Sequence, residues 1–305
     1  MNAPYWHTLS GKPPRVIAHR GASGQCPEHS REAFALAFSQ RADAVEPDVL
    51  PSRDGVLFVR HDVDLALTTD IAARAQFATR ARHVDGKSQW WIGDFVAAEL
   101  DTLHCIEPNP LRRRNAAGRS PILRLAQLLD MARAASCIVD IEIKDPAYFH
   151  ALGHAPADLL EAELGARHLL GADAPVWLEC FDLALLRTLH ARCGNRCFAL
   201  LEATPDENEL RSLAVWTSGL APSKTFLWDA VGNDSGLVAQ VHAAGLEVHA
   251  WTFRDDGDWL PFASPQAELV AAMEHGVDAL FCDFPASAVA LRDSLARRGE
   301  GGVVR

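Results

Sequence analysis

Short apolar stretches rich in β-branched residues recur eight times along the 305-residue chain, and most are separated by Ala- and Leu-rich stretches with helical spacing. Strands that alternate with helices in this way are typical of βαβ units and a parallel sheet. Eight units predict an α/β fold closed into a (β/α)₈ (TIM) barrel, and not an open, doubly wound sheet. The expected strands are 15–18, 44–49, 137–143, 176–179, 197–201, 225–228, 246–251 and 278–282, and the clearest helices are 31–40, 122–135, 183–192, 236–244 and 266–275.

One stretch, about 65–119, breaks the alternation and is richer in Arg, Trp and polar residues. We expect a single domain over 1–305, in which this stretch is an insertion folded on the barrel rim after the second strand. Its basic run, Arg112-Arg113-Arg114, could face a substrate or a partner, although such runs are more often solvated. Its Trp90-Trp91 pair could wall the site or anchor the insertion, and the sequence leaves both open.

Composition excludes several classes of protein. Twenty-nine basic against 40 acidic residues give a formal charge of −11, which argues against nonspecific nucleic-acid binding and against electrostatic docking on an anionic bilayer. No apolar run approaches the roughly 20 residues that span a membrane. Residues 1–14 lack the pattern of a secretion signal, so we expect a cytoplasmic protein, or a periplasmic one if a leader has been removed. Seven scattered cysteines without a CxxC predict reduced, structural thiols, and nothing in the sequence fixes an oligomeric state.

Charged residues interrupt strands that should be almost entirely apolar. Glu46 and Asp48 lie two apart on the second expected strand, so their side chains point the same way. Asp140, Glu142 and Lys144 alternate in the same manner on the third. Charges that project inward at the carboxyl ends of several strands are typical of a barrel active site.

Three carboxylates, Glu46, Asp48 and Glu142, would repel one another if they were left unpaired. One divalent cation with oxygen ligands resolves this repulsion, and Ca²⁺ or Mg²⁺ fits carboxylates better than Zn²⁺ does. A salt-bridge cluster with Arg20 and Lys144 would resolve it equally well. Spacing alone leaves both interpretations open.

Two histidines are placed for chemistry. His19 ends the first expected strand, and a hairpin through 52–59 returns His61 beside the end of the second. Two imidazoles near a metal and an arginine suit phosphoryl chemistry, because one can take a proton from a nucleophile while the other gives one to a leaving oxygen. Arg20 can clamp phosphate oxygens with two hydrogen bonds.

At this point an ordered set of motifs resembles the glycerophosphodiester phosphodiesterase family over nearly the whole chain. Within the insertion, Asp85-Gly86 and Gly93-Asp94-Phe95 further resemble its longer, periplasmic-type bacterial branch. Each motif alone is weak, but their order is specific. The matching motifs are His19-Arg20-Gly21, Pro27-Glu28-His29-Ser30, Glu46-x-Asp48, Asp54-Gly55, His61-Asp62, Ile141-Glu142-Ile143-Lys144, His249-Ala250-Trp251-Thr252, Gly276-Val277-Asp278 and Asp283-Phe284-Pro285.

The resemblance implies a (β/α)₈ barrel that hydrolyses glycerophosphodiesters to an alcohol and glycerol 3-phosphate through a cyclic phosphate. It implies that Glu46, Asp48 and Glu142 bind the divalent cation. It also implies that His19 and His61 are the acid–base pair, and that Arg20 and Lys144 hold the phosphate. Three departures from the family pattern concern substrate fit and strand geometry more than these groups: His29, Pro47 and Cys180 stand where other residues are common.

Other residues near strand ends have roles that the sequence alone leaves open. Trp251 and Phe181 could pack against the glycerol carbons of a substrate or simply fill the barrel. Glu179 could orient Lys144 or a water molecule. We expect His249 to be a core histidine, Asp283 to be a helix cap or rim residue, and Cys180 and Cys282 to be unreactive thiols.

Two further functional hypotheses remain. The same chemistry could act on lysophospholipids, as in a lysophospholipase D, if Phe77, Trp90, Trp91 and Phe95 built an apolar groove near the mouth. Alternatively, the barrel could bind a phosphate ligand without turnover, although the presence of every proposed catalytic group argues against this.

Overall fold

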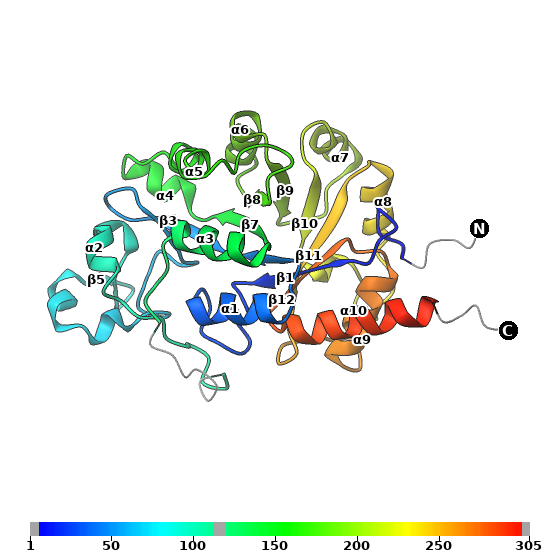
Figure 1. Ribbon diagram of the computed structural model, residues 1–305, viewed down its shortest axis with the longest axis horizontal. Helices are drawn as coiled ribbons and strands as arrows, with labels where there is room; N and C mark the ends of the chain where they lie inside the picture. The colour runs from blue at the N-terminus through cyan, green and yellow to red at the C-terminus, as the bar shows by residue number, and fades with distance from the viewer. Residues whose placement is uncertain (1–5, 113–119, 301–305) are drawn as a thin grey trace.

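A closed ring of parallel strands forms the centre of the computed structural model, which describes residues 6–112 and 120–300 (Figure 1). Strands β1 and β12 pair in parallel, and β2 pairs with both β1 and β7, so the sheet closes on itself. This confirms the predicted TIM barrel. Its strands are β1 (Arg15–His19), β2 (Ala44–Glu46) continued by β3 (Asp48–Pro51), β7 (Ile138–Ile143), β8 (Val176–Cys180), β9 (Arg196–Leu201), β10 (Gly219–Pro222), β11 (Glu247–Phe253) and β12 (Ala279–Cys282).

The second barrel strand is split at Pro47, which has no N–H to donate to a neighbouring strand. Its carbonyl still accepts from the backbone N–H of Glu142 at 3.0 Å, so the two halves stay on the same edge of β7. Beyond the break, β3 pairs in an antiparallel hairpin with β4 (Leu57–Val59). The hairpin predicted to return His61 toward the barrel is therefore present.

The prediction of a strand at 225–228 was wrong. Lys224–Phe226 form a 3₁₀ turn, η5, and the sixth barrel strand is β10, a few residues earlier. This strand begins with Gly219 and ends with Pro222, two residue types that are depleted in strands. Gly219 is needed because a Cβ there would lie 2.5 Å from the carbonyl oxygen of Glu247. The aromatic residues that suggested a strand instead pack beside the barrel.

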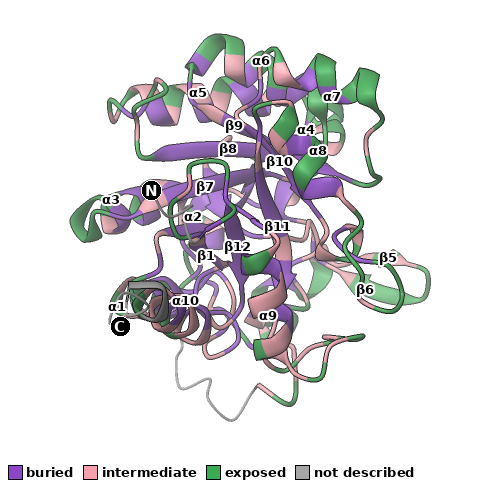
Figure 2. Cartoon of the chain, turned by 90° about the vertical axis from the view of Figure 1, so that its right-hand side faces the viewer, coloured by how far each residue is buried: buried purple, intermediate pink, exposed green. Residues whose placement is uncertain are grey.

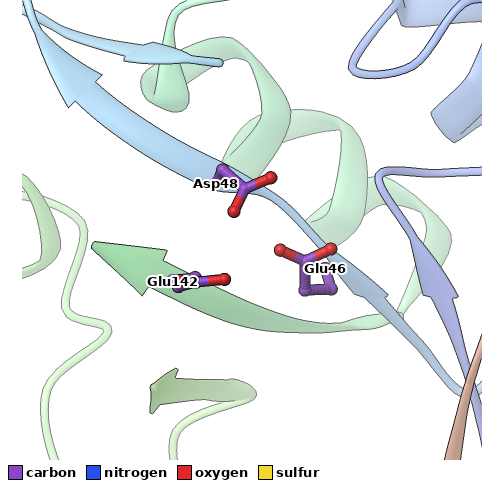
Figure 3. A group of neighbouring side chains, drawn as sticks. All are labelled: Glu46, Asp48 and Glu142. Carbon is purple, nitrogen blue, oxygen red and sulfur yellow. The ribbon is translucent and has the colours of Figure 1, made fainter. Parts of the chain in front are cut away.

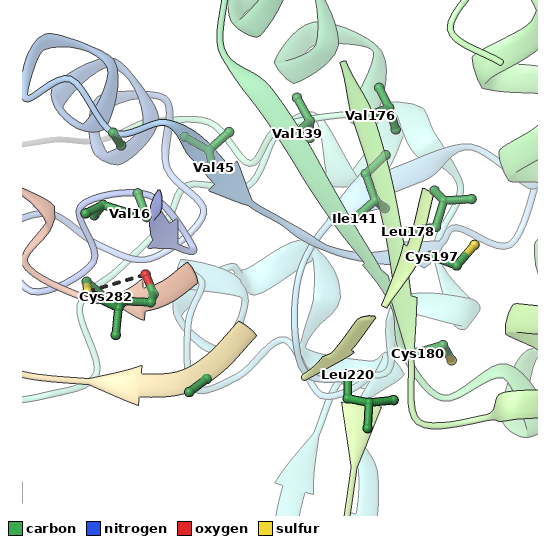
Figure 4. Packing of buried hydrophobic residues seen from close by; sticks show 14 of the residues in the cluster. Val16, Val45, Val139, Ile141, Val176, Leu178, Cys180, Cys197, Leu220 and Cys282 are labelled. Carbon is green, nitrogen blue, oxygen red and sulfur yellow. Dashed lines mark hydrogen bonds between the residues drawn. The ribbon is translucent and has the colours of Figure 1, made fainter. Parts of the chain in front are cut away.

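Helices surround the ring, and the chain is buried where strands meet helices and exposed on the outer helical faces (Figures 1 and 2). Outward-facing strand side chains such as Val139, Ile141 and Leu178 fill the layer between strands and helices (Figure 4). All five helices predicted from spacing are present. The helices are α1 (Arg31–Ser39), α3 (Leu125–Ala135), α4 (Pro146–Ala151), α5 (Pro156–Gly165), α6 (Leu183–Cys193), α7 (Glu207–Ala214), α8 (Leu237–Ala243), α9 (Pro265–Glu274) and α10 (Pro285–Glu300).

The stretch between β4 and α3 folds around a hydrophobic cluster of its own, which packs on Leu50 and Phe58 of the hairpin. Trp90 is buried in this cluster, and its indole N–H donates to the carbonyl of Phe77 at 2.8 Å. Trp90 therefore anchors the insertion. The elements of this stretch are η1 (Asp70–Ala73), η2 (Ala75–Arg80), β5 (Arg82–Val84), β6 (Lys87–Gln89), η3 (Ile92–Asp94) and α2 (Ala97–Leu100).

A buried arginine ties the insertion to the barrel. Arg60, 1% exposed, donates to the carbonyls of Val59 and Thr68 and to the thiol sulfur of Cys105. The insertion and the hairpin that carries His61 are thus held by the same guanidinium.

Each of the seven cysteines is a free thiol, as predicted, and all but Cys26 are buried. Among the described residues, no helix has the length and apolar character needed to cross a membrane.

Candidate active site

Three carboxylates meet at the carboxyl ends of neighbouring strands. Glu46 ends β2, Asp48 begins β3 and Glu142 lies near the end of β7, and Asp48 and Glu142 are register partners. Figure 3 shows their side chains turned toward a common space, and one oxygen of each lies within 4.8 Å of the others. All three are buried, with exposed fractions of 1%, 1% and 8%.

Burial of like charges sets the electrostatics of this triad. Burial, followed by the charge of Asp48, raises the pKa of Glu46 well above its usual value and that of Glu142 to about 8. Burial would also raise the pKa of Asp48, but the guanidinium of Arg20, followed by the neighbouring His29, holds it well below the usual range. One carboxylate is therefore firmly ionised, while its two neighbours bind protons readily.

Two cations border the triad. Arg20 Nε lies 3.1 Å from Asp48, and Lys144 Nζ lies 2.7 Å from Glu142. Arg20 has a left-handed φ of 58°, a conformation typical of strained functional positions. The backbone N–H of Arg20 donates to both the backbone carbonyl and a carboxylate oxygen of Glu46.

These cations do not satisfy every acid. Within the described part of the chain, no group donates a hydrogen bond to Oε1 of Glu46, although this atom is buried. A buried carboxylate oxygen without a donor fits a cation ligand. The triad is thus chemically suited to a hard divalent cation while also contacting Arg20 and Lys144.

Both predicted imidazoles are held by carboxylates. His19 Nδ1 lies 2.8 Å from Asp283, and His61 Nδ1 lies 2.6 Å from Asp62. A ring that donates through Nδ1 to a carboxylate leaves Nε2 as the nitrogen that exchanges a proton with a substrate. Burial and the adjacent Arg20 lower the pKa of His19, against the opposing effect of Asp283. The ring of His19 is therefore poised toward its neutral form at pH 7.

A cavity of about 410 Å³ unites these groups. Eight of the nine predicted site residues line it, and the ninth, Asp48, lies behind Arg20 and Lys144. Phe181 and Trp251 meet edge to face, with ring centroids 6.0 Å apart. They form an apolar side of the cavity beside Lys144, whose Nζ lies 5.6 Å from the ring of Phe181. The eight residues are His19, Arg20, Glu46, His61, Glu142, Lys144, Phe181 and Trp251.

The sequence predicted that Asp283 caps a helix or lies on the barrel rim, but its side chain contacts His19. The topology contained the signal: β12 lies beside β1, so the residue after β12 lies near the end of β1. His29 was also undervalued, because its imidazole is completely buried and accepts from the N–H of Asp48 at 3.2 Å. Burial lowers the pKa of His29 to about 4, which keeps the ring neutral.

The basic run of the insertion falls partly outside the described residues, since Arg113 and Arg114 are not described. Arg112 is not simply solvated. It makes a two-bond ion pair with Asp256, at 2.7 Å for each bond, and contacts Asp283 at 2.8 Å. The insertion therefore contacts Asp283, the carboxylate that holds the ring of His19.

Three other residues near strand ends, Glu179, His249 and Cys180, are buried in different surroundings. Glu179 lines the cavity, and burial, followed by the charge of Asp140, raises its pKa. His249 belongs to the barrel interior, as predicted, where its ring stacks on Phe198 at 3.8 Å. Burial raises the pKa of the Cys180 thiol to about 12, which makes it a poor nucleophile.

A closed barrel with acids, imidazoles and cations gathered at the carboxyl ends of its strands has the architecture of a TIM-barrel enzyme. Residues 19–287 match the model of the glycerophosphoryl diester phosphodiesterase family. The chain belongs to this family.

Two known relatives are similar to this chain along most of their length. The chain is 28% identical to glycerophosphodiester phosphodiesterase GDPD6 of Arabidopsis thaliana, with 90% of this chain and 84% of that protein aligned. It is 24% identical to a glycerophosphodiester phosphodiesterase of Treponema pallidum, over 88% of this chain and 89% of the relative.

Solved structures share the fold. The crystal structure of a Silicibacter pomeroyi protein superposes with a TM-score of 0.72 at 23% identity, over 95% of this chain and 98% of the other. A phosphodiesterase from Oleispira antarctica, in complex with the product sn-glycerol-3-phosphate, superposes with a TM-score of 0.70 at 23% identity, over 94% and 99%.

Proposed function

We propose that this protein hydrolyses small glycerophosphodiesters to an alcohol and glycerol 3-phosphate, with the help of one divalent cation. The observation that carries the proposal is the juxtaposition of a buried triad of acids with two carboxylate-held imidazoles around one cavity. Membership of the family supports it, as does the product found in the Oleispira antarctica protein.

Glu46, Asp48 and Glu142 are the residues that would hold the cation, and an all-carboxylate set favours Ca²⁺ or Mg²⁺. When bound, the cation supplies stabilisation of the negative charge that develops on the phosphate. Arg20 and Lys144 add positive charge on the cavity side of the triad. They would grip the nonbridging phosphate oxygens and orient the diester.

The two imidazoles would move the protons. In the first step a glycerol hydroxyl oxygen bonds to phosphorus while the bond from phosphorus to the alcohol oxygen breaks. One of His19 and His61 takes the hydroxyl proton, and the other gives a proton to the departing oxygen. Water then opens the resulting cyclic phosphate, and the two rings return their protons. Phe181 and Trp251 would pack against the glycerol carbons.

The position of the insertion's aromatic residues favours small diesters over lysophospholipids. Phe77, Trp90 and Phe95 are 5%, 7% and 0% exposed and belong to the core of the insertion. Trp91 packs edge to face on Tyr148, with ring centroids 5.3 Å apart. These side chains are committed to packing and do not offer an apolar groove for an acyl chain.

The test is an activity panel with metal-stripped protein, to which Ca²⁺ or Mg²⁺ is restored one at a time. We expect turnover of glycerophosphocholine to return with the cation and to exceed turnover of lysophosphatidylcholine. His19→Ala and His61→Ala should each abolish turnover in protein that keeps its melting temperature. Full hydrolysis by the double variant would refute the mechanism, and phosphate-ligand binding without turnover would indicate a noncatalytic barrel.

A further inference from the structure

A second cavity, of about 310 Å³, adjoins the catalytic one. His19, Arg20 and Arg254 line both, so these three residues stand at the junction. The outer walls come from the loop before α1, from the insertion and from the loop after β11. The lining residues that bear on its chemistry are Glu28, Glu107, Asn109, Arg112, Asp256 and Asp283.

We propose that this second cavity is the subsite for the alcohol head group and that it selects short, neutral, polyhydroxylated head groups. The inference rests on the proposed function, since it assigns a place to the second substituent of the same phosphodiester. Nothing in the chemistry of the acids or imidazoles by itself specifies that place.

The direction of the head group follows from the geometry of phosphoryl transfer. The attacking and leaving oxygens lie roughly in line on opposite sides of phosphorus. Arg20, the proposed phosphate ligand, stands at the junction, whereas Phe181 and Trp251 line only the catalytic cavity. A glycerol moiety packed on these aromatic rings therefore places the leaving alcohol on the other side of Arg20, in the second cavity.

The class of head group follows from how the walls are paired. Three of the four carboxylates in the lining contact arginines: Nε and Nη2 of Arg112 donate to Asp256, Asp283 contacts Arg254 at 2.9 Å, and Glu28 contacts Arg20 at 3.0 Å. The fourth, Glu107, accepts the backbone N–H of Asn109 at 2.8 Å. A cationic head group would have to compete with these arginines for their carboxylates. Neutral hydroxyl groups can bind without breaking these ion pairs, because a hydroxyl can both donate to a carboxylate and accept from a guanidinium group.

The insertion forms one wall of this cavity. Besides its pairs with Asp256 and Asp283, Arg112 is directed at the backbone carbonyl of Ser23 at 3.3 Å. Next to it, the side-chain oxygen of Asn109 accepts the N–H of Leu111 at 2.9 Å, which fixes the turn that carries Asn109 into the wall. Leu111 itself points outward and is 83% exposed. The insertion therefore supplies a head-group wall that can be altered without touching the acids or imidazoles.

The experiment compares sn-glycero-3-phosphoinositol with sn-glycero-3-phosphomethanol, whose methyl group is too small to use the second cavity. Asn109→Trp should reduce the ratio of kcat/KM for the inositol diester to that for the methyl diester at least tenfold. Leu111→Trp, its exposed neighbour, should leave this ratio within twofold. An unchanged ratio in Asn109→Trp, or an equal loss on both substrates, would overturn the head-group assignment.

A gain in specificity provides the second arm, which a misfolded variant could not mimic. Asn109→Asp keeps the oxygen that accepts from Leu111 but adds a negative charge to the wall. We expect it to raise kcat/KM for glycerophosphocholine relative to glycerophosphoinositol at least fivefold. An unchanged preference would count against the assignment, whereas a wild-type protein inactive on every glycerophosphodiester would overturn the proposed function itself.

Discussion

Asp283 Oδ1 lies 2.8 Å from Nδ1 of His19, although the two residues are 264 positions apart in the chain. Its other oxygen, Oδ2, accepts from Arg112 and Arg254 at 2.8 and 2.9 Å. Burial would raise the pKa of Asp283, but the hydrogen bond with His19 and the charges of Arg254 and Arg112 hold it well below its usual range. Asp283 is therefore ionised and is held in place by Arg112 and Arg254. Its hydrogen bond fixes the orientation and the tautomer of the His19 ring.

Asp283→Asn should lower kcat by about 10²- to 10⁴-fold with little change in KM, because an amide in place of the partner carboxylate favours the wrong imidazole tautomer. Steady-state kinetics on glycerophosphocholine would measure this. Asp293→Asn is the matched control, since Asp293 contacts Arg41 and Arg292 away from the catalytic cavity. Wild-type kcat in Asp283→Asn would show that His19 needs no carboxylate partner.

Gly21 allows the end of β1 to approach helix α1. Its φ is +82°, and a Cβ there would lie 2.7 Å from the backbone carbon of Ala33. Gly21→Ala should therefore cost more than about 2 kcal/mol of unfolding free energy, through both backbone strain and the clash. It should also reduce turnover, because Arg20 is its neighbour.

Gly86 is the matched control for this substitution. Its φ is +76°, but a Cβ there would have nothing within 4 Å. Gly86→Ala should cost only the backbone strain, about 1 kcal/mol, and leave turnover unchanged. Urea unfolding followed by tryptophan fluorescence would compare the two variants, and equal losses would contradict a role for the contact with Ala33.

Much of the ring and of the candidate site could be predicted from the sequence, because both leave local signals. Alternating apolar and amphipathic stretches specify βαβ units. Carboxylates inside buried strands are costly to bury, so their presence indicates a functional site or an ion pair. Glu46, Asp48 and Glu142 were found in this way, and the structure brings them together. Parallel strands present their carboxyl ends on one side, so topology converts three separate signals into one site.

What escaped prediction depends on tertiary contacts that have no local signature. The strand Gly219–Pro222 lacks β-forming residues at its ends, because its position is set by close packing against β11. The role of Asp283 depends on the closure of β12 onto β1. The reach of Arg112 across to Asp256 depends on how the insertion folds, which charge patterning alone does not specify.

The amino-end floor of the barrel should contribute pH-dependent stability. Glu247 lies 3.4 Å from Arg15, 3.0 Å from Arg196 and 3.1 Å from His249. Burial would raise its pKa, but the hydrogen bond with His249 and the two arginines lower it to about 2. Because the folded-state pKa lies below the usual 4.5, this stabilisation is complete above about pH 4.5 and is lost as the pH falls toward about 2.

Glu247→Gln should therefore reduce the free energy of unfolding by about 2–3 kcal/mol at pH 7. The difference between wild type and variant should narrow as the pH falls below about 4.5. Urea titrations at pH 7, 5 and 4 would measure it. A difference that stays constant down to pH 4 and below, or that grows as the pH falls, would rule out ionised Glu247 as its source.

Cation binding should become tighter as the pH rises toward 8. In the absence of a cation, burial and the neighbouring Asp48 raise the pKa of Glu142 to about 8, so its carboxyl is largely protonated at pH 7. A cation binds the ionised form and must displace this proton. The apparent affinity for Ca²⁺ or Mg²⁺ should then increase by up to about tenfold per pH unit for each proton released. Calorimetric titrations in buffers of different ionisation enthalpy would count the protons.

Glu142→Gln should reduce the number of protons released and weaken the binding, whereas Glu161→Gln, on the outer helix α5, should change neither. Binding that is independent of pH between 6 and 8 would show that Glu142 is already ionised or does not ligate the cation.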